Sequence, residues 1–401
     1  MKILAIETSC DETAIAIMEG KGGAKNPSIT VLSHNVASQI ALHTQYGGVF
    51  PMMAKREHSK NIIPLFKKTL ETCSSDIKLK KQSGHIETKK QKKVEEILAR
   101  EPELLGQFLP FISSIKKPAI DLIAVTVGPG LEPALWVGIN FARALSFVWD
   151  IPVVPVNHME GHILSVLAPK QKENEKLIMK NEKWNFPAIS LLVSGGHTEL
   201  VLVKDWGKYQ VIGQTRDDAV GEAFDKVARM LDLPYPGGPE ISKLAETARN
   251  EKLIMKNEKI KLPRPMIHTK DFDFSFSGLK TAVLYLIRDL GKITDMEKKL
   301  IAREFEDSAV EVLVHKTLNA MKKYKANTLI VGGGVSANTH LKRELLSRME
   351  TEKFRAYFPT KELSTDNAIM IGIVGIHKFL KTKKGVRFDS KRLVATGNLE
   401  F

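Results

Sequence analysis

The feature that most limits what this chain can fold into is a pattern that occurs twice: an apolar strand, a short polar turn and a second apolar strand. The first copy is KILAIETSCDETAIAIM, with its turn at residues 7–13, and the second is FPAISLLVSGGHTELVLV, residues 186–203. Apolar runs on either side of a turn predict a β-hairpin. Because helical segments follow each hairpin, we expect a duplicated α/β protein with a cleft between its halves.

The turns of these hairpins differ in chemistry. The first presents hydroxyls and carboxylates, including Asp11 and Glu12, whereas the second presents the backbone amides of a glycine turn. A third glycine turn lies in TLIVGGGVSANTHLKREL and is followed by a helix, which places Asn338 and the amides of residues 332–334 at a helix N-terminus, where anions are favoured. The run IDLIAVTVGPGLEPALWVGINFARAL predicts a strand, a tight turn and an amphipathic helix.

Composition is consistent with two folded domains and no membrane span. The chain has 401 residues, 43% of them apolar and 26% charged, which excludes a disordered protein. It has no apolar run of about 18 residues, and acidic residues follow Met1 too soon for a signal peptide. We therefore expect a cytoplasmic protein. With only Cys10 and Cys73, a disulfide framework is excluded, and Cys10 is interpreted as a small buried thiol.

The charge balance indicates a polyanionic partner. The net charge is +14, and residues 78–93 carry seven lysines against the single acidic Glu87. This block is either a solvated loop or helix face, or a contact for nucleic acid phosphates. A second unusual feature is the decapeptide NEKLIMKNEK, which occurs at 174–183 and again at 250–259. We interpret both copies as one element inserted in surface loops, where insertions cost little stability.

Two histidines lie four residues apart in VNHMEGHILS. In a helix, His158 and His162 leave the same face and can share one metal ion with a distant carboxylate such as Asp366. The alternative is a pair of core histidines with satisfied hydrogen bonds. At about 100° per residue, Glu160 faces away from the pair, so it is not placed as the catalytic base of a zinc peptidase.

Seven motifs occur in the order found in one family. They are ETSCDETA, NHMEGH, LLVSGGHTEL, DDAVGEAFDKVARMLDLPYPGGP, FSFSGLKTAV, GGGVSANTHL and STDNAIMIG. Together they resemble the bacterial-type tRNA threonylcarbamoyladenosine transferases of the actin, heat-shock-chaperone and sugar-kinase superfamily. The resemblance implies a duplicated actin-like ATPase fold with the active site in an interdomain cleft. We expect subdomains at 1–157, with a lysine-rich insert at about 78–106, and at 158–366 with the metal and nucleotide sites. Residues 367–401 are expected to pack back on the first subdomain.

The resemblance also implies an activity. Such enzymes move the threonylcarbamoyl group from threonylcarbamoyl-AMP to N6 of the adenosine immediately 3′ of the anticodon, in tRNAs reading codons that start with A. Carried over by motif, one divalent ion, iron or alternatively zinc, is held by His158, His162 and Asp366. Asp11 and Glu12 fall at a turn where carboxylates matter for activity. The nucleotide or substrate-binding set becomes Leu192, Val193, Ser194, Gly195, Gly196, Asp225, Gly238 and Asn338.

The motifs allow more than one role for Asp11 and more than one function for the chain. Asp11 either orients or deprotonates the attacking amine, or caps backbone amides of its turn. The archaeal and eukaryotic branch has a tyrosine ligand before the second glycine turn, but this chain reads ISLLVSGG there, so three protein ligands are expected. The family implies tRNA, a paralogous partner subunit and a small P-loop ATPase as partners, and no membrane. The main alternative function is a sugar or carboxylic acid kinase of the same superfamily, which has no need of a paired-histidine metal site.

Overall fold

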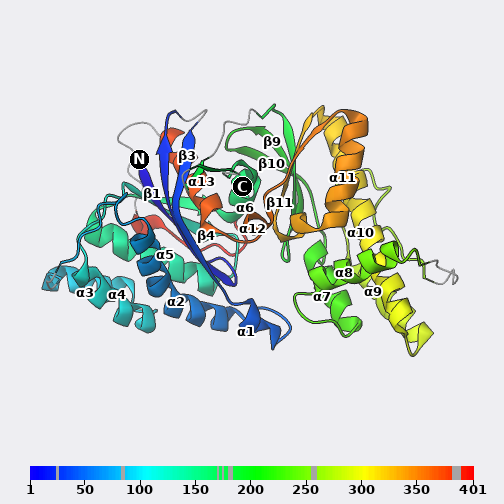
Figure 1. Cartoon of the computed structure of the whole chain (residues 1–401), viewed down its shortest axis with the longest axis horizontal. Helices are drawn as coiled ribbons and strands as arrows, with labels where there is room; N and C mark the ends of the chain where they lie inside the picture. Colours follow the sequence, from blue (N-terminus) through cyan, green and yellow to red (C-terminus); the bar gives the residue numbers. More distant parts are fainter. Residues whose placement is uncertain are drawn as a thin grey trace. The chain divides into compact units, whose positions relative to one another are not determined.

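The computed structural model describes residues 1–23, 27–82, 86–168, 171–173, 176–178, 184–253, 260–381 and 390–401. The chain forms two compact units, each with its own sheet and core (Figure 1). The first contains residues 1–182 and 366–401, and the second contains residues 183–365. None of the helices formed by the described residues is both long and apolar enough to cross a membrane.

The sheet of the first unit has the strand order β5-β4-β1-β2-β3-β7-β6. β1 pairs antiparallel with β2 and parallel with β4, so the predicted hairpin and the strand of IDLIAVTVG share one sheet. Its strands are β1 (Lys2–Glu7), β2 (Glu12–Lys21), β3 (Ser28–Ser38), β4 (Leu122–Gly128), β5 (Val153–Asn157), β6 (Gln171–Glu173) and β7 (Lys176–Ile178). Its helices are α1 (Ile40–Thr44), α2 (Pro51–Thr72), α3 (Thr88–Ile97), α4 (Pro102–Ser114), α5 (Glu132–Trp149), α6 (His158–Leu164) and α13 (Ala368–Lys381).

Helices cover both faces of this first sheet. Successive strand residues point to opposite faces, and one face of β1 carries Leu4 and Ile6, which join the core formed with α2 and α5. The other face carries Ile3 and Ala5 and packs on α13, where a Cβ on Gly372 would lie 3.3 Å from the Ala5 methyl group. The strands are therefore buried on both sides, which explains their continuous apolar sequence.

The second unit repeats the same topology. Its strand order is β10-β9-β8-β11-β12, with β8 antiparallel to β9 and parallel to β11, so β8 corresponds to β1 and β9 to β2. The strands are β8 (Ala188–Val193), β9 (Thr198–Asp205), β10 (Lys208–Gln214), β11 (Thr328–Gly332) and β12 (Arg355–Tyr357). The helices are α7 (Val220–Met230), α8 (Gly237–Asn250), α9 (Ser277–Leu290), α10 (Asp295–Tyr324), α11 (Thr339–Glu352) and α12 (Lys361–Ser364). The predicted duplication is confirmed.

The boundaries differ from those expected from the sequence. We placed the first subdomain at 1–157 and the metal ligands in the second, whereas the first unit extends to 182 and includes His158 and His162. The physical reason is that α6 follows β5 directly and packs against α13, which in turn lies on β1. Of the repeated decapeptide, 176–178 form β7, Asn250 is the last residue of α8, and 251–253 follow that helix; the other residues of both copies lie outside the described residues.

Candidate functional site

The paired histidines lie on a helix that begins at the first of them. The Asn157 side chain caps α6 by accepting hydrogen bonds from the amides of Met159 (2.8 Å) and Glu160 (3.2 Å). This cap fixes the start of the helix at His158, so His162 lies about one turn further along the same face. The two Nε2 atoms are 3.0 Å apart, and both side chains are buried.

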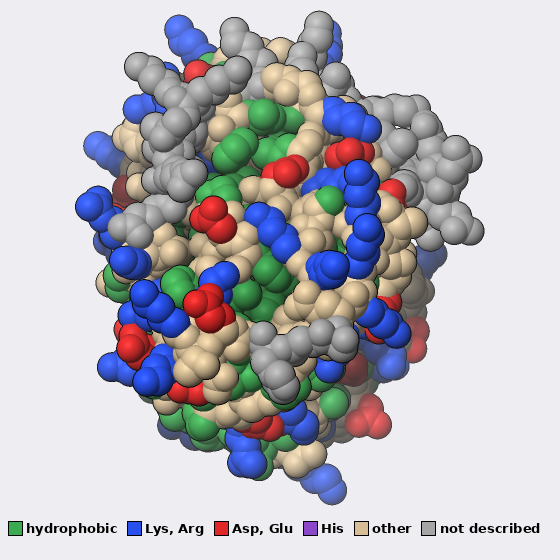
Figure 2. All heavy atoms as spheres, turned by 90° about the vertical axis from the view of Figure 1, so that its left-hand side faces the viewer, with side chains coloured by type: hydrophobic (Ala, Val, Ile, Leu, Met, Phe, Trp, Pro, Cys, Tyr) green, Lys and Arg blue, Asp and Glu red, His purple; other side chains and the backbone are tan. Residues whose placement is uncertain are grey.

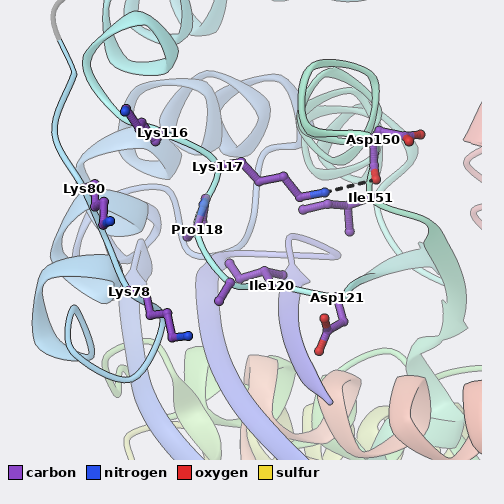
Figure 3. Close-up of a pocket in the computed structure, with 10 residues that line it drawn as sticks. Lys78, Lys80, Lys116, Lys117, Pro118, Ile120, Asp121, Asp150 and Ile151 are labelled. Atoms are coloured by element: carbon purple, nitrogen blue, oxygen red, sulfur yellow. Dashed lines mark hydrogen bonds between the residues drawn. The ribbon is translucent and has the colours of Figure 1, made fainter.

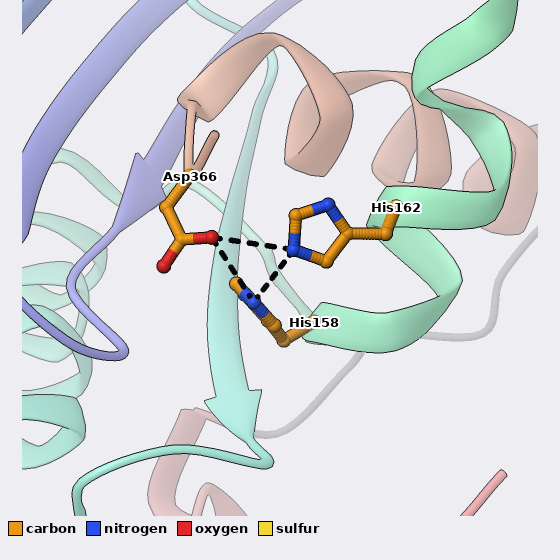
Figure 4. A group of neighbouring side chains, drawn as sticks. All are labelled: His158, His162 and Asp366. Atoms are coloured by element: carbon orange, nitrogen blue, oxygen red, sulfur yellow. Dashed lines mark hydrogen bonds and ion pairs between the residues drawn. The ribbon is translucent and has the colours of Figure 1, made fainter. Parts of the chain in front are cut away.

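A carboxylate from the segment before α13 completes the group. Asp366 Oδ1 lies 3.3 Å from His158 Nε2 and 3.2 Å from His162 Nε2 (Figure 4). An ion with bonds of about 2.1 Å separates neighbouring ligand atoms by about 3.0–3.4 Å, depending on the coordination angle. The observed spacings match this requirement. Two imidazoles and a carboxylate can thus hold one divalent ion and leave coordination positions open.

Behind this group, Glu7 positions His158. The Glu7 side chain is fully buried at the end of β1, and its Oε2 lies 3.0 Å from His158 Nδ1. It also accepts hydrogen bonds from Thr126 Oγ1 (2.7 Å) and from the amide of Ser9 (2.6 Å). An ionised Glu7 can only accept, so it holds the His158 proton on Nδ1 and leaves Nε2 free to bind a metal.

Glu7 is a residue that reasoning from the sequence missed. In the sequence it is only the first residue of the polar turn. The available signal was an acidic residue that ends an apolar strand, a position from which a side chain is buried rather than solvated. Its role depends on contact with His158, which comes from a distant part of the chain.

The site has a strongly negative field. Burial opposes charge on each group, but Asp366 and Glu7 outweigh it and raise the pKa of His158 well above its usual value. In the same way, His158 and His162 outweigh burial and hold the pKa of Asp366 well below its usual range. Burial lowers the pKa of His162, so this imidazole is neutral. A field that retains a proton on His158 also favours a cation.

The two predicted catalytic carboxylates lie in the β1–β2 turn of the same unit. Asp11 and Glu12 are both buried, and Ser38 Oγ donates to Glu12 Oε1 at 3.2 Å. Burial, together with the charges of Asp11 and Asp366, raises the pKa of Glu12 to about 10. The turn is therefore close enough to Asp366 for the carboxylates to interact.

A buried histidine supports the turn from α2. His58 lies 2.9 Å from the Cys10 carbonyl oxygen through Nε2 and 2.7 Å from Thr13 Oγ1 through Nδ1. The adjacent thiol is half-buried, and burial followed by the charge of Asp11 raises the pKa of Cys10. A thiol with a raised pKa is a poor nucleophile, although Cys10 is half-buried and not fully buried as expected.

Glu160 takes no part in the metal group. Its carboxylate lies 2.9 Å from Lys378 Nζ on α13, which agrees with the helical geometry that directs it away from the two histidines. Glu160 is therefore not placed as the base of a zinc peptidase.

In the second unit, the glycine turn between β8 and β9 is closed by a serine. Leu192 and Val193 are buried at the end of β8, and Ser194 Oγ accepts hydrogen bonds from the amides of Gly196 (3.3 Å) and His197 (3.0 Å). The amide of Gly196, which the glycine turn was expected to offer to a ligand, is therefore already engaged. A Cβ added at Gly195 or Gly196 would meet nothing within 4 Å, so these glycines border open space.

The other predicted nucleotide residues are connected to this turn through α7 and α8. Gly221 of α7 donates its amide to Ser194 O at 3.2 Å, and Asp225, one turn later, accepts from the amide of Gly237 at 2.7 Å. Burial raises the pKa of Asp225. Gly238 follows in the first turn of α8, and a Cβ there would also meet open space.

The third glycine turn differs from the prediction. Residues Gly334–Ala337 form a separate 3₁₀ turn, so the amides of 332–334 do not begin α11. Asn338 is the residue that caps α11, accepting from Leu341 N at 2.8 Å. Its Nδ2 donates to Ser242 Oγ (2.9 Å) and Glu306 Oε1 (2.8 Å). Asn338 is therefore a junction between α8, α10 and α11.

These observations define a duplicated actin-like ATPase fold that carries a two-histidine, one-carboxylate metal group. The fold is shared with the crystal structure of full-length HypF in the phosphate- and nucleotide-bound form, at a TM-score of 0.51 and 14% identity over 95% of this chain. The chain spans about half of that protein, 47% of its length.

Comparison with known sequences gives the family. The family model described as tRNA N6-adenosine threonylcarbamoyltransferase matches residues 30–82 and 110–373. The relative of that name from Paraburkholderia xenovorans is 41% identical over 377 residues, covering 94% of this chain and 91% of its own. The one from Persephonella marina is 40% identical over 392 residues, covering 97% and 93%. The chain belongs to this family.

Proposed function

We propose that the chain transfers the threonylcarbamoyl group of threonylcarbamoyl-AMP to N6 of the adenosine immediately 3′ of the anticodon, in tRNAs that read codons starting with A. The adenine N6 attacks the carbamoyl carbon, the bond from that carbon to the AMP phosphate oxygen breaks, and AMP leaves with the bonding electron pair. One N6 proton passes to a base. The observation that carries the proposal is the His158, His162 and Asp366 group beside the acidic β1–β2 turn, in a chain of this family.

The metal group supports this chemistry through its open positions. His158, His162 and Asp366 would hold one divalent ion, with iron as the proposed metal and zinc as the alternative. When bound, such an ion supplies Lewis-acid polarisation to an oxygen of the substrate. Glu7 fixes the tautomer of His158, and Asn157 fixes its place on the helix, so the ligands are held in place before substrate arrives.

The proton from N6 requires an acceptor. We propose Asp11 for this role, since it lies in the turn that adjoins the metal group, whereas Glu12 retains its own proton because its pKa is raised to about 10. Among the described residues, no serine or cysteine at this turn is paired with a base as an acyl acceptor would be: Ser9 Oγ and His158 Nδ1 are 3.2 Å apart, but that imidazole is oriented by Glu7. Direct transfer is therefore proposed.

The AMP portion is assigned to the second unit. We propose that Gly195, Gly196 and Gly238 allow the nucleotide to approach the backbone, because side chains are absent there and the protein leaves the space open. Leu192, Val193 and Ser194 shape the same turn, while Asp225 and Asn338 hold the α7, α8 and α11 segments around it. Asn338 acts here by holding these helices, since its side-chain groups already have protein partners.

The alternative of a small-molecule kinase has no comparable support. Both relatives described above carry the transferase name, and a kinase does not require the buried histidine pair. The partners implied by the resemblance, a paralogous subunit and a small P-loop ATPase, are part of the proposal, as is action in the cytoplasm on tRNA.

Reconstitution tests the proposal. Purified chain with its partners, threonine, bicarbonate, ATP, a threonylcarbamoyl-AMP synthase and unmodified tRNA should yield threonylcarbamoyladenosine, measured by mass spectrometry of digested nucleosides. Asp11→Ala should lower kcat by about 100-fold or more while tRNA affinity changes little, because a base acts mainly in the transition state. Absence of the modified nucleoside, with phosphorylation of a small sugar or acid instead, would support the kinase.

A further inference from the structure

A lysine-lined pocket lies in the first unit, away from the metal group. It has a volume of about 540 Å³, and its floor includes the buried side chains of Pro118, Ile120 and Ile151 (Figure 3). Four exposed lysines surround it: Lys78, Lys80, Lys116 and Lys117. The only acidic residues in the lining are Asp121 and Asp150. The pocket is therefore positively charged.

Backbone hydrogen bonds hold the lysine-bearing segments in register. Segments 77–82 and 114–119 run antiparallel, joined by bonds from Ala119 N to Ile77 O (2.7 Å), from Lys116 N to Lys80 O (2.9 Å) and from Gln82 N to Ser114 O (2.9 Å). The rim is thus built on a paired backbone rather than on a free loop. The backbone pairing thus brings the lysines of both segments to one hollow.

The charges of these lysines are not neutralised within the protein. Lys117 Nζ donates to the Asp150 carbonyl oxygen at 3.3 Å, not to a carboxylate. Among the residues that the structure describes, none of the ion pairs involves any of the four lysines. Asp121 accepts instead from the amide of Lys2 at 2.7 Å. Four lysines against two carboxylates in the lining leave an excess of positive charge, which favours an anion.

We propose that this pocket binds backbone phosphates of the tRNA substrate, which rests on the proposed function. Its lining has no aromatic side chain and no amide side chain, so it recognises charge and not a base. The segment carrying Lys78 and Lys80 also leads into α3, whose first turns bear further lysines. Figure 2 shows Lys and Arg side chains spread across this side of the molecule, with apolar side chains between them. This extended charge suits a polyanion better than a single small phosphate.

The place of the pocket in the sheet defines its role. β1 and β4 run parallel, and the pocket adjoins their N-terminal ends, whereas Glu7 and the metal group adjoin the C-terminal end of β1. The five steps from Lys2 to Glu7 span about 16 Å. A ligand in the pocket is therefore too far away to enter the chemistry. A tRNA is long enough to contact both, so the pocket contributes to binding and not to the reacting geometry.

A charge-neutralising variant with a matched control tests this. The variant is Lys78→Gln/Lys80→Gln/Lys116→Gln, and the control is Lys204→Gln/Lys270→Gln/Lys292→Gln, which removes the same charge from exposed lysines of the second unit. Affinity for unmodified tRNA is measured over a range of salt. The pocket variant should bind about tenfold more weakly, and the slope of log affinity against log salt should fall in magnitude by about 2. KM for tRNA should rise with kcat unchanged.

Other outcomes overturn the proposal. An equal loss of tRNA affinity in the variant and in the control would show an effect of net charge alone. Saturable binding of inorganic pyrophosphate to the wild type, lost in the variant while tRNA affinity is kept, would assign the pocket to a small phosphate. Unchanged tRNA affinity with weaker binding of a partner protein would assign it to an acidic protein surface. Wild-type protein that binds tRNA but never modifies it would refute the proposed function, while the comparison of affinities would still decide the role of the pocket.

Discussion

The two units share one strand order but carry turns of opposite chemistry after the first strand. In the first, the β1–β2 turn carries carboxylates, and Glu7 at its start is in contact with a buried histidine. In the second, the equivalent β8–β9 turn consists of Ser194, Gly195, Gly196 and His197 and contains no carboxylate. The shared strand order therefore fixes only where the turn lies in each unit. The residues of the turn decide whether it attracts a cation or admits an anion.

The two turns also differ in how closely the surrounding protein packs against them. Polar groups in the first unit are buried and bonded to one another, so changing one disturbs its neighbours. The glycines at the second turn border open space, and a new side chain there meets the ligand before it meets the protein. We therefore expect larger effects from substitutions in the first unit than from those at the second turn.

The largest effect is expected for His158→Ala. Loss of one of three ligands should remove most of the bound iron or zinc, measured by elemental analysis, and reduce tRNA modification by more than about 100-fold. Glu160→Gln on the same helix is the matched control and should retain the metal, because Glu160 contacts Lys378 instead. A full metal content in His158→Ala would show that the ligand assignment is wrong.

Glu7→Gln should have the next largest effect. The amide group of the new glutamine can donate to His158 Nδ1. This favours the tautomer with the proton on Nε2, and Nε2 is the atom that must bind the metal. Affinity for Co²⁺, followed by its visible absorption, should fall about 10- to 100-fold. Thr126→Val removes one hydrogen bond to Glu7 but keeps the charge, so it should have a smaller effect. Equal metal affinity in wild type and Glu7→Gln would leave Glu7 as a packing residue only.

At the second turn, Gly195→Val should weaken AMP binding about tenfold or more while the melting temperature changes little, because a Cβ at this position meets no protein atom within 4 Å. Calorimetric titration with AMP measures this affinity. Gly333→Ala is the contrast, since Gly333 has φ +86° and a Cβ there would lie 2.4 Å from Val193 O; this variant should be unstable. Unchanged AMP affinity in Gly195→Val would place the nucleotide elsewhere.

The last prediction concerns the pH dependence of stability and tests the first sheet apart from its metal-binding residues. Burial lowers the pKa of His34 on β3 to about 4. Between pH 6.5 and 4 the unfolded chain therefore binds a proton that the folded chain does not, so stability falls as pH falls through this window. The loss from this group is at most about 3 kcal/mol. Chemical unfolding gives the free energy of unfolding at pH 7 and at pH 4.5. The difference between these two values should be smaller for His34→Gln than for the wild type. An equal difference in both proteins would mean that other groups dominate the pH dependence.

Local features of the site were predictable because they depend on near neighbours in sequence. The hairpins followed from apolar runs on either side of polar turns, and the helical pair followed from the four-residue spacing of His158 and His162. The position of Asn338 at the start of α11 was expected too, but not its contacts with Ser242 and Glu306. Those contacts come from separate helices, and no local pattern specifies which helices meet.

The sequence by itself determined the duplicated strand pattern, the two kinds of turn chemistry and the family motifs, because each is written in residues close along the chain. Only the tertiary structure decided that the first unit extends to residue 182 and includes the histidines, that Glu7 orients His158, and that two segments place four lysines around one pocket. The physical reason is that burial and contact between distant segments depend on how the sheets and helices pack, and packing brings together residues that no spacing in the sequence relates.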